Sequence, residues 1–167
     1  MGTKRVGLAR IEALMENLKR DLAMGAGTFS GLSLATKAAP ASTTTELTAA
    51  DSGKVILMAP NAAAIVLPTP VVGMSFRIVL TGAYATAPCT IKTVTTDGSV
   101  FFVGHSVSAA SDDGNVSDNN SNDVITFGSA TLAGDHVELV AISTTEWWAV
   151  SSAQTGNGSN SIVFSDS

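Results

Sequence analysis

The first apolar positions of the chain repeat with a helical period. Large apolar side chains occur at alternating spacings of three and four residues, at Leu8, Ile11, Met15, Leu18 and Leu22. An average spacing of about 3.5 residues is that of the a and d positions of a coiled coil, whereas a helix that packs on a globular core has a wider apolar stripe. We therefore expect residues 1–24 to form a coiled-coil helix that associates with copies of itself through these side chains.

The pattern changes after Met24. Residues 25–45 are rich in Gly, Ala, Ser and Thr and low in charge, which favours an extended linker. From Glu46 onward, short apolar runs alternate with clusters of Gly, Pro, Asn and Asp, which is typical of strands joined by turns. The expected strands are residues 54–58, 64–67, 74–80, 90–94, 100–103, 124–127, 137–142, 147–150 and 162–164.

Short strands at an even spacing predict a mainly β domain over residues 46–167. We expect an antiparallel β-sandwich or barrel of jelly-roll-like character. A glycine followed by an apolar strand recurs at Gly53, Gly73 and Gly134. We interpret this recurrence as turn chemistry and not as a structural repeat.

Two adjacent tryptophans are candidates for an interface. Trp147 and Trp148 fall in one expected strand, so their side chains point to opposite faces of the sheet. One of them can lie in the core. The other must be exposed or buried between subunits, where tryptophan is enriched, and the sequence leaves these two alternatives open.

Charge divides the chain into a basic start and an acidic remainder. Residues 1–24 carry five basic and three acidic side chains, and the rest carries four basic and eleven acidic ones. The acidic remainder disfavours nucleic acid as a partner, because phosphate binding requires clustered Lys and Arg. The basic excess fits either an acidic protein surface or the solvated positions of a coiled coil. No apolar run is long enough for a membrane span or a signal peptide, so we expect synthesis in the cytoplasm and no membrane partner.

The sequence contains no recognisable catalytic motif. It has one cysteine and two histidines, and it lacks a nucleophile elbow and a phosphate-binding loop. His105 is expected in a turn, and His136 is expected beside Glu138 on one strand face, as a surface pair. These patterns predict no enzyme activity, no catalytic residues and no cofactor.

The acidic segment 108–123 is the one long polar insertion among the expected strands. It offers oxygen ligands of the kind that calcium binds, but Gly114 comes too early for an EF-hand and no Glu closes the loop. We interpret it as a solvated surface loop without a metal, with calcium as the alternative.

Several segments together resemble small virion proteins of tailed phages, marine and cyanobacterial ones especially. The segments are Thr3–Leu22, Glu46–Leu57, Ile65–Pro68, Gly73–Ile78, Gly134–Leu139 and Glu146–Trp148. The first is similar to the N-terminal helix of that group, and the others are similar to its β-domain. The resemblance covers most of the chain apart from the linker and the acidic segment.

The resemblance implies a structural component of the virion, assembled in the host cytoplasm, and it carries over no catalytic residues. A capsid decoration (cement) protein that binds the major capsid protein is the first expectation. The alternative is a head-fibre or tail-fibre component with a β-rich receptor- or carbohydrate-binding module, for which Tyr84 and the tryptophan pair are the aromatic candidates. Leucine-type residues at the a positions, with Ile11 at a d position, depart from the usual pattern of dimers and favour a homotrimer.

Overall fold

A computed structural model describes residues 11–13, 34–95, 98–108, 116–117, 121–154 and 161–167. The chain divides into two compact units, residues 1–33 and residues 34–167. In the first unit, the described residues 11–13 are helical. The remaining heptad positions lie outside the described residues, so the N-terminal coiled coil stays a prediction: Leu8, Met15, Leu18 and Leu22. None of the described helical segments combines the length and the apolar character that crossing a bilayer requires.

The second unit is mainly β. Its described residues form eleven strands and a short 3-10 helix, η1 (Ala49–Asp51). The strands are β1 (Thr36–Ala39), β2 (Thr44–Glu46), β3 (Val55–Met58), β4 (Ala64–Val66), β5 (Ser75–Leu80), β6 (Cys89–Lys92), β7 (Phe101–Ser108), β8 (Val124–Phe127), β9 (His136–Ala141), β10 (Glu146–Ala153) and β11 (Ile162–Ser165).

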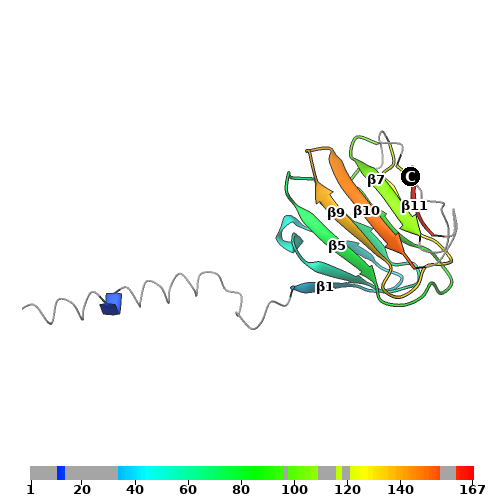
Figure 1. Ribbon diagram of the computed structural model, residues 1–167, viewed down its shortest axis with the longest axis horizontal. Coiled ribbons are helices and arrows are strands. Elements are labelled where there is room, and N and C mark those ends of the chain that lie inside the picture. The colour runs from blue at the N-terminus through cyan, green and yellow to red at the C-terminus, as the bar shows by residue number, and fades with distance from the viewer. Residues whose placement is uncertain (1–10, 14–33, 96–97, 109–115, 118–120, 155–160) are drawn as a thin grey trace, which may run out of the picture. The chain divides into compact units, whose positions relative to one another are not determined.

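The described strands belong to two sheets, termed here the front sheet and the back sheet. The front sheet has the order β1-β3-β5-β9-β10-β7, and the back sheet has the order β11-β8-β6-β4-β2. In Figure 1, β5, β9, β10 and β7 of the front sheet face the viewer. Both sheets are mixed, with parallel and antiparallel neighbours in each.

The first six strands alternate between the sheets. β1, β3 and β5 are parallel neighbours in the front sheet, and β2, β4 and β6 are parallel neighbours in the back sheet. Thr36 pairs with Val55 and Val55 pairs with Arg77, so the chain returns to the same row of the front sheet on each pass. This part of the chain therefore winds around the core and does not turn back in hairpins.

The expected antiparallel arrangement is wrong for this winding. Antiparallel neighbours can be joined by a tight turn, whereas parallel neighbours need a crossover, and here the crossover is a strand of the opposite sheet. The later strands restore antiparallel pairing in part. β9 is antiparallel to β5 and β10, β8 is antiparallel to β6 and β11, and β7 is parallel to β10.

Inward-facing side chains of both sheets form one hydrophobic core. Along β10, buried residues such as Trp147 and Ala149 alternate with more exposed ones, as a strand with one buried face requires. The ring of Trp147 lies 5.7 Å from that of Phe76 on β5. Phe102 of β7 and Phe164 of β11 meet edge to face across the two sheets, with ring centroids 6.3 Å apart. The sheets therefore share a core in a sandwich-like arrangement.

The β-unit begins earlier than the sequence predicts. Residues 36–39 and most of residues 44–46 fall in the expected linker, yet they form β1 and β2, and the compact unit begins at Leu34. Both strands consist of small and polar residues, so their own sequence does not mark them as strands. Pairing with β3 and β4 gives them the strand conformation. In the structure, the compact β-unit thus includes residues 34–45 of the segment that was expected to be a linker.

A charged network holds the first turn of the winding together. Asp51 is buried, and its carboxylate accepts hydrogen bonds from Lys37 Nζ at 2.7 Å, Lys54 Nζ at 2.8 Å and the Thr48 backbone N–H at 3.0 Å. Lys37, together with Lys54, holds the pKa of the Asp51 carboxyl well below its usual range. Lys37 Nζ also donates to the Glu46 carbonyl oxygen at 3.1 Å. Glu46 lies on β2, the edge strand of the back sheet, so the charged Lys37 side chain protects that edge from pairing with another chain.

Candidate functional site

The outward-facing residues of the front sheet form the candidate site. The strand pairing aligns them in rows across the sheet. Trp148 on β10 is paired with Val140 on β9, and Val140 is paired with Ser75 on β5. On its other side, Trp148 is paired with Val103 on β7. A tryptophan therefore lies in the middle of a row of small side chains.

The outward-facing apolar residues of this surface are termed here the apolar outer face, and polar residues such as His105, His136 and Ser152 lie between them. Its members point outward and are partly exposed: Val55, Leu57, Val79, Val103, Val107, Val140, Trp148 and Val150. Trp148 is 40% exposed and Val107 is 50% exposed. Val140, Trp148 and Val103 are neighbours in one row, and contiguous apolar patches on soluble proteins mark surfaces for binding or assembly. The apolar outer face is therefore a candidate for contact with another protein.

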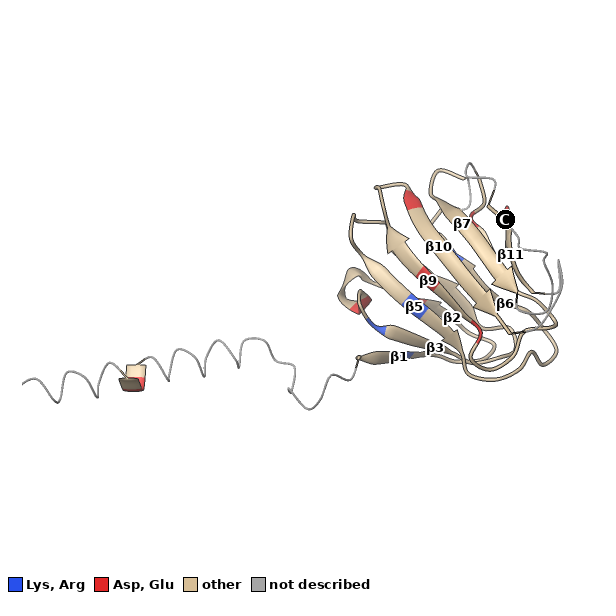
Figure 2. Ribbon diagram, in the orientation of Figure 1, with Lys and Arg blue, Asp and Glu red and all other residues tan. Residues whose placement is uncertain are grey.

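Few charges interrupt the apolar outer face. Arg77 on β5 and Glu138 on β9 form an ion pair with 3.5 Å between Nε and Oε1, and about half of each side chain is exposed. An exposed pair of this kind adds little to the stability of the free molecule. On the strands that face the viewer in Figure 2, one further charged residue is Glu146, at the start of β10. Arg77 and Glu138 are therefore available to a partner.

A shallow hollow lies at one side of the apolar outer face. It has a volume of about 180 Å³, and its wall includes Leu34, Val55, Ser75, Arg77 and Val140. The hollow therefore spans β3, β5 and β9 and adjoins the row that contains Trp148. The same surface offers a large protruding side chain and a recess next to it.

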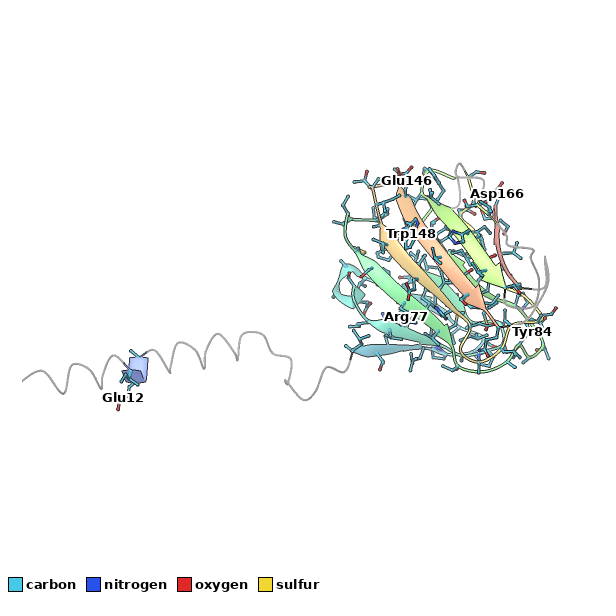
Figure 3. The ribbon with its side chains drawn as sticks, in the orientation of Figure 1. Glu12, Arg77, Tyr84, Glu146, Trp148 and Asp166 are labelled. Carbon is cyan, nitrogen blue, oxygen red and sulfur yellow. The ribbon has the colours of Figure 1, made fainter. Side chains whose placement is uncertain are left out.

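The structure separates the two tryptophans as the alternation predicts. Trp147 is fully buried and contacts Phe76 in the core, so it belongs to the interior of the single chain. Trp148 points outward from β10, and Figure 3 shows it on the front sheet together with Arg77. Of the pair, Trp148 is the residue that can take part in an interface.

The outer face of the back sheet differs in character. Its outward positions include a row of small and polar residues, in which Thr44 pairs with Ala64, Ala64 with Thr90, and Thr90 with Thr126. Lys92 and Glu46 lie at outward positions in the same sheet. The large apolar side chains are therefore concentrated on the front sheet and not spread evenly over both outer faces.

The structure does not gather the other candidate side chains into one site. His105 lies inside β7, paired with Val150, and not in a turn as expected. Glu138 pairs with Arg77, while His136 Nδ1 lies 3.1 Å from the Gly134 carbonyl oxygen. Tyr84 lies at the edge of the unit, away from Trp148, as Figure 3 shows. A pocket that combines Tyr84 with the tryptophan pair is therefore not formed.

The acidic segment 108–123 lies mostly outside the described residues. At its end, Asp123 is buried and its Oδ2 accepts a hydrogen bond from the Ser167 hydroxyl at 2.9 Å. Within the part of the chain that the structure describes, no three His, Cys, Asp or Glu side chains lie together in a way that suits a metal ion. Apart from Asp123, the acidic residues of the calcium alternative lie outside that part.

The apolar outer face was not predicted from the sequence, although the sequence holds a signal for it. In a strand with one solvated face, apolar and polar residues alternate, whereas apolar residues at consecutive positions indicate that both faces are apolar. Val55–Met58 and Leu139–Ile142 are such runs, and Ile78, Val79 and Leu80 form a third one in β5. These runs were sufficient to predict strands, and they also indicate the second apolar face.

Comparison with known proteins gives no relative. No protein-family model matches the chain, and no curated protein is similar enough to be counted as related. A function for this chain must therefore be inferred from the geometry of its described residues and from the patterns in its sequence.

Proposed function

We propose that this protein is a structural component of a phage particle and acts as a capsid decoration (cement) protein. In this role it binds the major capsid protein as a homotrimer. The observation that carries the proposal is the apolar outer face, because exposed apolar residues on the sheet of a packed β-unit suit contact between the proteins of an assembly. The resemblance of six sequence segments to virion proteins of tailed phages supports it independently.

The proposed role is mechanical. A protein that binds the assembled capsid but not its separate subunits stabilises the assembly by mass action. We propose that residues 1–24 contact the capsid, since their five basic and three acidic side chains make them net positive, whereas the whole chain has a net charge of −5. The acidic β-unit then faces solvent or neighbouring copies. Contacts to adjacent capsid subunits raise the resistance of the particle to heat.

The test is to locate the chain in purified particles of the phage that encodes it. Mass spectrometry establishes whether the chain is present, and electron microscopy with antibody-bound gold establishes where. Regular labelling of the head, with lower heat resistance of particles that lack the chain, is the expected result. Absence of the chain from the particles contradicts a virion role.

The fibre alternative has one observation in its favour. Trp148 is exposed on a sheet surface, and an exposed aromatic ring can stack against a sugar ring. Labelling only on tails or fibres, with glycan binding that Trp148→Ala abolishes, assigns the chain to a receptor- or carbohydrate-binding module. In that case the decoration role is rejected.

A further inference from the structure

We infer that the apolar outer face is a self-association surface, on which the β-unit of a second copy of this chain packs face to face. The occupant is identified by the fit of the surface to itself. Trp148 is exposed in the same row as Ser75 and Val140 of the hollow, and the ion pair of Arg77 and Glu138 is part of the wall of that hollow. This property is independent of a virion role, because it requires only the β-unit.

The size of the surface suits a dimer. Strands spaced about 4.8 Å apart and outward residues spaced about 6.7 Å apart along each strand give the face from β3 to β7 an area on the order of 600 Å². Two such faces bury about 1,200 Å² in total, which exceeds the area of about 1,000 Å² that a specific interface needs. Two sheets that meet in this way pack as the layers of a sandwich do.

Two-fold symmetry gives Trp148 a matching site. In an isologous dimer each contact occurs twice, from one copy to the other and back. The two-fold axis is placed parallel to β9, midway between the front sheets of the two copies. It then lays β10 of one copy over β5 of the other, because these two strands flank β9. Trp148 of one copy then lies over Ser75 of the other, because both residues pair with Val140. Ser75 is part of the wall of the hollow, so each tryptophan enters the recess of its partner.

The charges agree with the same axis. Glu138 lies on β9 itself, so the two Glu138 side chains meet near the axis. Arg77 is paired with Glu138 in the strand register, and the symmetry places one Arg77 on each side of the two glutamates. Each guanidinium can then bind a carboxylate of the other copy and also contact the incoming tryptophan ring. The ion pair that contributes little in the free chain thus gains a role between copies.

The experiment measures self-association of the full-length chain by sedimentation equilibrium. Ile11→Asp and Leu18→Asp are present in every sample, so that helix association does not hide association of the β-unit. We expect a dimer with a Kd of about 10 µM or tighter. Trp148→Ala should weaken it at least ~tenfold, because a central tryptophan carries much of the binding energy of an interface. Thr126→Ala, on the outer face of the back sheet, is the matched control and should leave the Kd unchanged.

A charge exchange tests the geometry further. Arg77→Glu should weaken the dimer, because it places four carboxylates near the axis. Combining it with Glu138→Arg restores both signs of charge and should restore the dimer. Circular dichroism of each variant confirms that the β-unit is folded.

Three results overturn the inference. They are a monomer at all concentrations, equal effects of Trp148→Ala and Thr126→Ala, and failure of the combined exchange to restore association. A monomer that binds capsids through Trp148 assigns the surface to the capsid protein and rejects self-association, while the virion role stands.

Discussion

Asp51 is the buried carboxylate on which the first turn of the winding depends. Its ion pairs with Lys37 and Lys54 are short, and its side chain is only 8% exposed. Asp51→Asn removes the charge and should lower the free energy of unfolding at pH 7 by about 2 kcal/mol, the scale of a hydrogen bond to a charged group. Urea denaturation measures the difference.

The same substitution makes a prediction about pH. Because the pKa of Asp51 is lowered by folding, its stabilisation is complete above the unfolded pKa of about 4 and is lost as the pH falls below that value. The stability difference between the natural chain and Asp51→Asn should therefore shrink below about pH 4. Glu46→Gln is the control, since its side chain is exposed and Lys37 binds only its backbone carbonyl oxygen, so a cost below about 0.5 kcal/mol is expected. Equal losses in the two variants would contradict a special role for Asp51.

Gly104 allows β7 and β10 to approach closely. A Cβ atom at this position would overlap the carbonyl oxygen of Ala149 on β10, with which Gly104 is paired. Gly104→Ala should therefore destabilise the β-unit by about 3 kcal/mol or more, because the backbone must move. Gly73→Ala is the matched control: its φ is +87° but it has open space around it, so a cost of about 1 kcal/mol is expected. Thermal and urea unfolding compare the two, and similar costs would contradict the steric explanation.

At the scale of the elements, β1 and β2 are the first strands of the β-unit, and deletions test where that unit begins. Deleting residues 1–33 removes none of the β-unit, so its melting temperature should be unchanged. Deleting residues 1–46 also removes β1 and β2, which uncovers the edges of β3 and β4 and breaks the network of Lys37 and Asp51. Exposed apolar edges favour aggregation. Circular dichroism and light scattering should show a folded first variant and an aggregating or unfolded second one. A stable second variant would show that the core begins at β3.

The elements also show what the sequence can reveal. The run Val124–Phe127 is apolar apart from Thr126 and lies between Asp123 and Gly128, and the structure gives β8 those limits. β1 and β2 escaped detection because their strand conformation comes from pairing partners, not from their own residues. β7 was expected to end before Gly104, because Gly104-His-Ser106 is typical of a turn. In the structure, pairing with β10 continues the strand to Ser108. Long-range pairing decides these cases, and a single sequence does not display it.

The direction of pairing was predicted incorrectly for a related reason. Even spacing of strands and turns is shared by hairpin folds and by chains that wind between two sheets. Gly53 precedes β3 and Gly73 precedes β5, and both glycines have a positive φ. These two occurrences of a glycine before an apolar strand therefore fall at successive passes of the chain through the front sheet. For the candidate site, the opposite directions of Trp147 and Trp148 could be predicted from alternation. The recess and the position of Arg77 could not, because they depend on which strands are neighbours.

For the whole molecule, the heptad predicts association through residues 1–24. Ile11 is 58% exposed in the single chain, which is costly for a large apolar side chain without a partner. Replacing Ile11 and Leu18 by Asp should lower the molar mass measured by light scattering, because charges without partners cannot be buried in the seam. Glu12→Gln, beside Ile11, is the control. An unchanged molar mass would contradict the coiled coil.

Docking on a particle can be tested with the same boundary at Leu34. A chain that lacks residues 1–33 should fail to decorate capsids and should retain a folded β-unit. Binding is measured by co-sedimentation with particles stripped of the chain. Full occupancy by the shortened chain would show that the β-unit provides the capsid contact, and the proposed orientation would be reversed.

The winding of β1 to β6 has a consequence for how such a protein can change in length. Each pass lays one strand in the front sheet and one in the back sheet, and β1 and β2 end those sheets as edge strands. Tandem duplication of one pass, for example residues 48–67, would add a layer to both sheets without disturbing the pairing of the others. A gene that encodes this architecture can therefore grow by whole layers, while β7 to β11 close the unit unchanged.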